Sequence, residues 1–139
     1  VGLSRKNRRN KIIYLYKFGG KKMENIIVLF EVTIKDGKIE DYLKRANELK
    51  EYLKNIKGFV RAERFSSLIV EEKLLSMTVW EDEESIKKWR NMEAHRLSQK
   101  AGRDNDFTNY KITVVKTVRE YEMNDRENAP TDSNNYFNV

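Results

Sequence analysis

The only histidine of the chain lies in a short stretch that also holds aromatic, basic and amide side chains. Residues 88–103 read KWRNMEAHRLSQKAGR and contain Trp89, His95, Arg96, Gln99 and Arg103. An imidazole titrates near neutral pH, so His95 could accept a proton from a substrate or ligate haem iron. The two arginines could hold a carboxylate or a phenolate. A surface histidine, a core tryptophan and solvated arginines are the ordinary alternative, and both interpretations stay open.

Motifs for other kinds of chemistry do not occur. The sequence has no Ser/His/Asp arrangement, Walker loop, GxGxxG or HExxH motif, and no cysteine that could supply a disulfide, a thiolate ligand or a nucleophile. A lone histidine is a poor metal site, so we predict no metal. The acidic run at residues 81–84 is interpreted as charge at a helix start, where the dipole favours it, and not as an acid/base pair.

Helical phase decides whether His95 can share a cavity with Trp89. At about 100° per residue, one straight helix that turns Ile86 towards the core keeps Trp89 within about 60° of it and points His95 to the opposite side. The alternative is a break near Asn91, which is a good N-cap for a restarted helix with Glu93 in its first turn. Such a break would let three polar side chains face a cavity: His95, Arg96 and Gln99.

The elements that must position these residues are four strands and two helices. Apolar periodicity predicts strands at 26–34, 59–68, 73–80 and 108–121, and helices at 39–56 and after the acidic run at 81–84. Asp36-Gly37 is a turn signal, and Gly58 suits a left-handed helix C-cap. The order β-α-β-β-α-β is that of a ferredoxin-like α+β fold, an antiparallel four-stranded sheet with two helices on one face.

The strand predicted at 26–34 is apolar on both faces in its first half. One alternating set begins Ile26, Val28, Phe30, and the other begins Ile27, Leu29. Helices cover only one face of a ferredoxin-like sheet, so we predict that a second copy packs on the other face in a homodimer. The alternative is a monomer whose open face is partly shielded by the C-terminal tail.

Basic charge is concentrated at the start of the chain. Residues 1–22 hold eight of the 28 Lys and Arg and no acid, whereas the rest has 20 basic and 22 acidic residues. Residues 19–23, GGKKM, are what a purine-rich ribosome-binding site would encode, so we expect Met23 to be the physiological start and 1–22 a translated leader. The chain is therefore divided into a basic extension (1–22), one domain (23–122) and a polar tail (123–139) of weak order.

The sequence does not favour nucleic acid or a membrane as a partner. Residues 57–60, KGFV, faintly resemble the RNP1 motif of RNA-binding domains, but they lack the second Gly/Phe pair and lie on the second strand instead of the third. No apolar run approaches the roughly 18 residues of a membrane span. The basic N-terminus lacks the apolar core of a signal peptide, so we expect a cytoplasmic protein.

A series of short motifs runs along the chain from about Asn25 to Tyr121. In order they are Phe30-Glu31-Val32, Gly37, Gly58-Phe59, Glu63-Arg64-Phe65, Trp80, Trp89-Arg90-Asn91, Glu93-x-His95-Arg96, Gln99, Gly102-Arg103, Phe107, Tyr110 and Arg119-x-Tyr121. The tail adds Arg126 and Ala129-Pro130-x-Asp132-Ser133. Together these motifs resemble the antibiotic biosynthesis monooxygenase (ABM) domain family. The resemblance implies a dimeric α+β barrel.

One branch of the resembled family oxidises aromatic polyketides without metal or flavin. In that branch the anion of the substrate donates an electron to O₂, so the resemblance implies a protein that binds and deprotonates its substrate. Trp80 matches a pocket tryptophan of this branch, whereas Ser76 stands where the branch has an asparagine.

Another branch degrades haem. Trp89 fits its helix tryptophan, but Phe30 stands in place of its strand asparagine and Gln99 in place of its ligand histidine. His95 lies one helical turn earlier. A haem role would therefore need His95 to act as the ligand from a different position.

We therefore expect a small ABM-type monooxygenase that oxidises an aromatic, quinol-like or haem substrate without a metal or flavin cofactor. His95, as proton acceptor or ligand, and Trp89 would be catalytic. The substrate-binding residues would be Trp80, Arg96, Gln99, Arg103, Phe30 and Ser76. The alternative is a non-catalytic small-molecule-binding or stress-related protein on the same fold.

Overall fold

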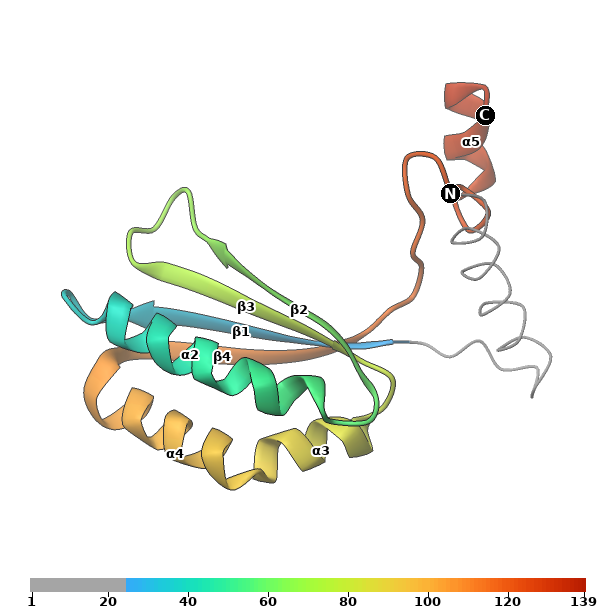
Figure 1. Cartoon of the computed structure of the whole chain (residues 1–139). Helices are drawn as coiled ribbons and strands as arrows, with labels where there is room; N and C mark the ends of the chain where they lie inside the picture. Colours follow the sequence, from blue (N-terminus) through green and yellow to red (C-terminus); the bar gives the residue numbers. More distant parts are fainter. Residues whose placement is uncertain (1–24) are drawn as a thin grey trace.

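A computed structural model describes residues 25–139, and its central feature is an antiparallel four-stranded sheet (Figure 1). The strand order is β2-β3-β1-β4, formed by β1 (Ile26–Ile34), β2 (Phe59–Ser66), β3 (Lys73–Trp80) and β4 (Phe107–Lys116). The predicted extension at 1–22 and the predicted start at Met23 lie outside the described residues.

Helices cover one face of this sheet and leave the other open (Figure 1). The covering helices are α2 (Ile39–Lys54), α3 (Glu83–Asn91) and α4 (Glu93–Ala101). The ferredoxin-like α+β fold is therefore confirmed. None of the helices within residues 25–139 has the length and apolar character needed to cross a membrane.

Strand β1 separates the two faces by its alternation. Val32 and Ile34 point under the helices and are almost completely buried. Ile27 and Leu29 point to the open face, where they lie opposite Val79 and Met77 of β3. The apolar residues on both faces of β1 thus have different surroundings, and only one set is covered by the chain's own helices.

Two turns depend on glycine. Gly37 and Gly58 have φ angles of +75° and +91°, in the left-handed region that side chains rarely adopt, which confirms the predicted turn at Gly37. Gly58 is left-handed as expected, but its predicted role as the helix C-cap is wrong, because α2 ends at Lys54 with Asn55 as its C-cap. A Cβ on Gly58 would also collide with the side chain of Ser85. Glycine therefore lets β2 begin against the N-terminus of α3.

The second helical region is broken, as one of the two sequence interpretations predicted. Met92 is extended, with φ −63° and ψ 131°, between α3 and α4. Glu93 lies in the first turn of α4 as expected, but the predicted N-cap is wrong by one residue. Met92 takes the cap position without a side-chain bond, and Asn91 instead accepts a hydrogen bond from Arg96 at 2.7 Å.

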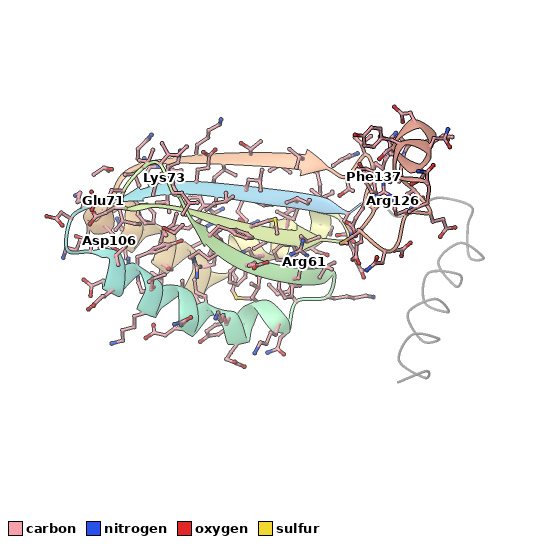
Figure 2. All side chains as sticks on the ribbon, turned by 90° about the horizontal axis from the view of Figure 1, so that it is seen from above. Arg61, Glu71, Lys73, Asp106, Arg126 and Phe137 are labelled. Atoms are coloured by element: carbon pink, nitrogen blue, oxygen red, sulfur yellow. The ribbon has the colours of Figure 1, made fainter. Side chains whose placement is uncertain are left out.

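The C-terminal tail differs from its prediction. Strand β4 ends at Lys116, short of the predicted 121, and the segment expected to have weak order contains α5 (Thr131–Phe137). Arg126 explains the order, because it donates to Asn134 and Ser133 at 2.8 Å each and lies over the ring of Phe137. Figure 2 shows Arg126 and Phe137 together, at the end of the molecule opposite Asp106.

Candidate functional site

A cavity of about 560 Å³ lies between the sheet and its helices. It interrupts the core, because the buried residues form two separate clusters instead of one. Trp80 and Ile86 of one cluster and Tyr42 of the other all contribute to its walls. Its volume lies in the range of small-molecule sites, about 300–1,000 Å³.

Small side chains keep this space open. Four of the lining residues are small: Ala46 of α2, Ala62 of β2, Ser76 of β3 and Ser98 of α4. Large apolar residues at these positions would fill the gap, since protein cores otherwise pack without voids.

His95 lies in the wall of the cavity, stacked on Trp89. The ring centroids are 4.3 Å apart and the planes differ by 18°. His95 Nδ1 lies 3.0 Å from the backbone oxygen of Trp89, and a carbonyl oxygen can only accept. Nδ1 therefore carries the hydrogen in this contact, which leaves the lone pair on Nε2 when the ring is neutral.

Burial keeps this imidazole neutral. Loss of solvent lowers the pKa of His95 from 6.5 to about 4, against the bond to Trp89, which raises it, while the charge of Arg96 lowers it further. His95 therefore presents an unprotonated nitrogen at neutral pH. Such an atom can accept a proton or ligate a metal ion.

The helix break makes the stack geometrically feasible. A continuous helix would point Trp89 and His95 in directions about 120° apart, whereas the extended residue Met92 changes the direction of the chain between them. The same break leaves the oxygen of Trp89 at the end of α3, where it accepts from Met92 N–H at 3.2 Å and from His95. Asp82 fixes the other end of α3 by accepting from Ser85 N–H, and this bond lowers the pKa of Asp82.

The other predicted site residues divide into two groups. Four line the cavity beside Trp89 and His95: Phe30, Ser76, Trp80 and Gln99. Two do not. Arg96 is exposed and bonds Asn91, and Arg103 is exposed and donates to the hydroxyl of Tyr110 at 3.1 Å. The predicted role of these two arginines in holding substrate therefore has no geometric support.

Different cations line the cavity. They are Lys50 of α2, Arg64 of β2 and Arg90 of α3. A signal for Arg64 was present in the sequence, because the hairpin between the second and third strands places it opposite Ser76, which was already a candidate. Lys50 and Arg90 lie on helices, and the sequence does not show how each helix packs on the sheet and which of its charged residues face the cavity.

Two features beside the cavity hold its end in place. Asp106, only 2% exposed, pairs with Arg45 of α2 and so ties the π-helix η1 (Gly102–Asp106) to that helix. A Cβ on Gly102 would collide with the ring of Phe107, which lines the cavity. Glycine there lets the ring of Phe107 lie against the turn that precedes β4.

Potential ligands for a metal do not gather in the described part of the chain. Within residues 25–139 no group of three or more His, Cys, Asp or Glu side chains has the arrangement of a metal site. Haem requires only one axial protein ligand, and His95 Nε2 is the nitrogen in the lining that could provide it.

The sequence of this domain matches a known family. The family model described as antibiotic biosynthesis monooxygenase matches residues 25–101. The chain belongs to this family. The match covers β1 to α4, and so includes the Trp89–His95 stack and most of the cavity lining.

A curated relative supports the assignment to the ABM family. The protein named jasmonate monooxygenase ABM, from the fungus Pyricularia oryzae, is 31% identical over 104 residues. The alignment covers 75% of this chain and 48% of the relative. This chain therefore spans about half the length of that protein.

Solved structures share the fold at low sequence identity. A Pseudomonas aeruginosa protein is 15% identical with a TM-score of 0.61, over 70% of this chain and 99% of that one. A Methanosarcina mazei protein is 17% identical with a TM-score of 0.63, over 68% and 94%. A Caulobacter crescentus protein that carries the ABM name is 14% identical with a TM-score of 0.63, over 69% and 92%. These likenesses support the fold of the ABM domain.

Proposed function

We propose that this ABM domain is a monooxygenase for a small aromatic or quinol-like substrate, and that O₂ reacts directly with the substrate anion. The observation that carries the proposal is the geometry of His95, whose Nδ1 contacts the backbone oxygen of Trp89 and so leaves Nε2 to accept a proton in the wall of a mainly apolar cavity. The relative named as a jasmonate monooxygenase supports oxygenase chemistry on this domain. The description of the matched family, antibiotic biosynthesis monooxygenase, also supports oxygenase chemistry.

In the proposed reaction His95 Nε2 removes a proton from an acidic O–H or C–H of the substrate. The resulting anion donates an electron to O₂, and the two radicals combine. Oxidation of a ring CH₂ to a carbonyl then consumes one O₂ and releases one H₂O. The substrate supplies all four electrons, so no external reductant is required.

The low basicity of His95 sets a condition on this step. A base with a pKa of about 4 takes a proton from a phenol of pKa about 10 at a cost of about 8 kcal/mol. Positive charges near the substrate anion reduce this cost, because they stabilise the product of the proton transfer. The lining cations Lys50, Arg64 and Arg90 supply such charges.

The experiment is O₂ uptake by the full chain with a panel of anthrones, naphthols, quinols and jasmonate. We expect consumption with at least one phenolic or quinol-like compound, and a loss of about 10²- to 10⁴-fold in His95→Ala, the usual contribution of a general base. Lys100→Ala is the matched control, because Lys100 is exposed on the same helix and makes only a surface ion pair with Asp104. Equal rates in both variants and the parent would contradict the role of His95.

Haem provides the competing outcome. Haemin titration would produce a shifted Soret band if His95 Nε2 ligates iron, and His95→Ala would remove it. That result, together with no O₂ uptake on the organic panel, would overturn the direct reaction in favour of haem chemistry. Failure of both measurements would favour a non-catalytic binding protein.

The open face of the sheet supports a homodimer as the working form of this enzyme. Ile27 pairs with Val79 and Leu29 pairs with Met77, so these four apolar side chains form a strip on that face, in which Ile27, Leu29 and Met77 are only partly buried. No helix of residues 25–139 covers this face (Figure 1). A second copy would bury the strip by packing sheet against sheet.

A further inference from the structure

Among the cations that line the cavity, Arg64 stands out by a buried donor atom that has no hydrogen-bond partner in the described part of the chain. Its side chain reaches from β2 into the cavity lining, and its Nε is buried without a hydrogen-bond acceptor in the described part of the chain. Its guanidinium carbon lies 5.4 Å from the ring centroid of Tyr42, in cation–π contact. A buried donor without an acceptor costs free energy, so its position needs an explanation.

The carboxylates near Arg64 do not provide that explanation. Among residues 25–139 no acid lies within ion-pair distance of Arg64. The acid that lines the cavity, Glu63, is directed to Arg61 at 3.6 Å. The buried acid Asp106 pairs with Arg45. The charge of Arg64 is therefore available to a ligand.

The lining as a whole favours an anion on an apolar molecule. Lys50 and Arg90 add two positive charges, and neither forms an ion pair within residues 25–139. The rest of the wall is mainly apolar and aromatic, including Val28, Leu49 and Ile112. A planar guanidinium held by an aromatic ring matches a planar carboxylate with two parallel hydrogen bonds.

We propose that Arg64, held over Tyr42, is the carboxylate-binding residue of this cavity, and that the ligand is an apolar monocarboxylic acid of small or medium size. The proposal rests on the proposed function only in placing the ligand in the same cavity. Arg64 is a specificity-determining residue in this scheme, and His95 acts on another part of the bound molecule.

The test is isothermal titration calorimetry of the full chain with naphthoate and with naphthol, near neutral pH and without O₂. Naphthoate carries a carboxylate under these conditions, whereas naphthol is uncharged and has the same apolar body. We expect Arg64→Gln to weaken naphthoate binding roughly 10- to 100-fold, the range of a hydrogen bond to a charged group, and naphthol binding less than about 2-fold. Arg64→Lys should restore part of the loss, because it keeps the charge but not the planar fork.

Lys87→Gln is the control, since Lys87 is an exposed cation of α3 that does not line the cavity and forms no ion pair within residues 25–139. It should leave both affinities unchanged. The melting temperature adds a second readout. Removal of a cation that lacks a partner should leave Arg64→Gln as stable as the parent or more so. A drop of several degrees with unchanged affinity would assign Arg64 a structural role and overturn the proposal.

Two further outcomes would contradict the carboxylate assignment. Equal losses for naphthoate and naphthol in Arg64→Gln would mean that Arg64 holds the reacting oxygen, and would overturn the carboxylate assignment. No naphthoate binding by the parent protein would overturn it as well. Binding and O₂ uptake are independent measurements. Arg64-dependent binding without turnover would contradict the proposed function and leave this inference standing. Turnover of phenols without carboxylate binding would contradict this inference and leave the proposed function standing.

Discussion

The two faces of the sheet carry similar apolar residues but meet different surroundings. On the helix side Val32 and Trp80 are completely buried, and yet a cavity of about 560 Å³ remains between the two core clusters. On the open side Ile27 and Leu29 are only half-buried, beside a surface network in which Glu31 lies 3.1 Å from Lys73. The helix side has covering helices and a cavity beneath them, whereas none of the helices of residues 25–139 covers the open side.

On the helix side, different residues contribute to the stability of the fold and to the proposed binding of a ligand. The two buried clusters contribute the burial that stabilises the domain, while small side chains in the cavity wall leave room for a ligand. The open side offers apolar area that would contribute to stability only after association. Substitutions on the two faces should therefore differ in what they change.

The largest expected effect is on the helix side, at Trp80. Trp80→Ala removes a completely buried ring, and we expect the free energy of unfolding to fall by about 3–5 kcal/mol. Urea unfolding followed by circular dichroism measures the change. Val118→Ala, at an 88% exposed position, is the control and should change the free energy by less than about 0.5 kcal/mol. A loss below about 1 kcal/mol in Trp80→Ala would mean that the cavity walls do not carry the stability.

A second helix-side change tests the buried ion pair. Asp106→Asn leaves Arg45 without its partner at the end of the cavity, and we expect a loss of about 3 kcal/mol, as for other buried pairs. The exposed pair of Lys100 with Asp104 is the comparison, and Asp104→Asn should cost less than about 1 kcal/mol. Equal losses in urea unfolding would show that burial does not distinguish the two pairs.

The third prediction concerns acid sensitivity of the helix side. The pKa of His95 is lowered from 6.5 to about 4 in the folded chain, so the unfolded chain binds a proton between these pH values and the folded chain does not. The free energy of unfolding is therefore full above about pH 6.5 and falls by up to about 3 kcal/mol as the pH drops to about 4. Urea unfolding across this range should show a smaller fall in His95→Gln. Parallel curves for the two proteins would refute the assignment.

The smallest effect on the fold, and the clearest effect on assembly, is expected on the open side. Leu29→Asp places a charge on a half-buried strip and should cost a single chain only about 1 kcal/mol. It should also halve the mass seen by analytical ultracentrifugation, because a sheet-to-sheet contact would bury that charge. Val118→Asp, away from the strip, should keep the mass of two chains. A parent protein that sediments as one chain would contradict the homodimer.

The elements of the fold were predictable because their patterns are local. The bounds of β1 and β3 follow from runs of apolar and β-branched residues, and both match the structure. Errors occurred where local signals were weak. Strand β4 was predicted to continue to 121, and α5 was missed, because the order of that tail depends on Arg126 contacting residues seven and eight positions away.

The candidate site was predictable in part. The strand residues that the family resemblance singled out, Phe30, Ser76 and Trp80, line the cavity, and they share a face of the sheet because alternation fixes the face of a strand residue. The two arginines chosen because they lie near His95 in the sequence do not line the cavity. Arg96 and Arg103 point to solvent, since neighbours in a helix lie on different sides of it.

The sequence by itself determined the order of elements, the family, and the need for a break between Trp89 and His95 if the two were to meet. Only the tertiary structure decided that they do meet, in a stack of 4.3 Å, and that Arg64 replaces Arg96 and Arg103 at the cavity. The physical reason is that periodicity sets which face of an element a side chain occupies. The packing of helices on the sheet then sets what that face meets, and burial sets the pKa of His95.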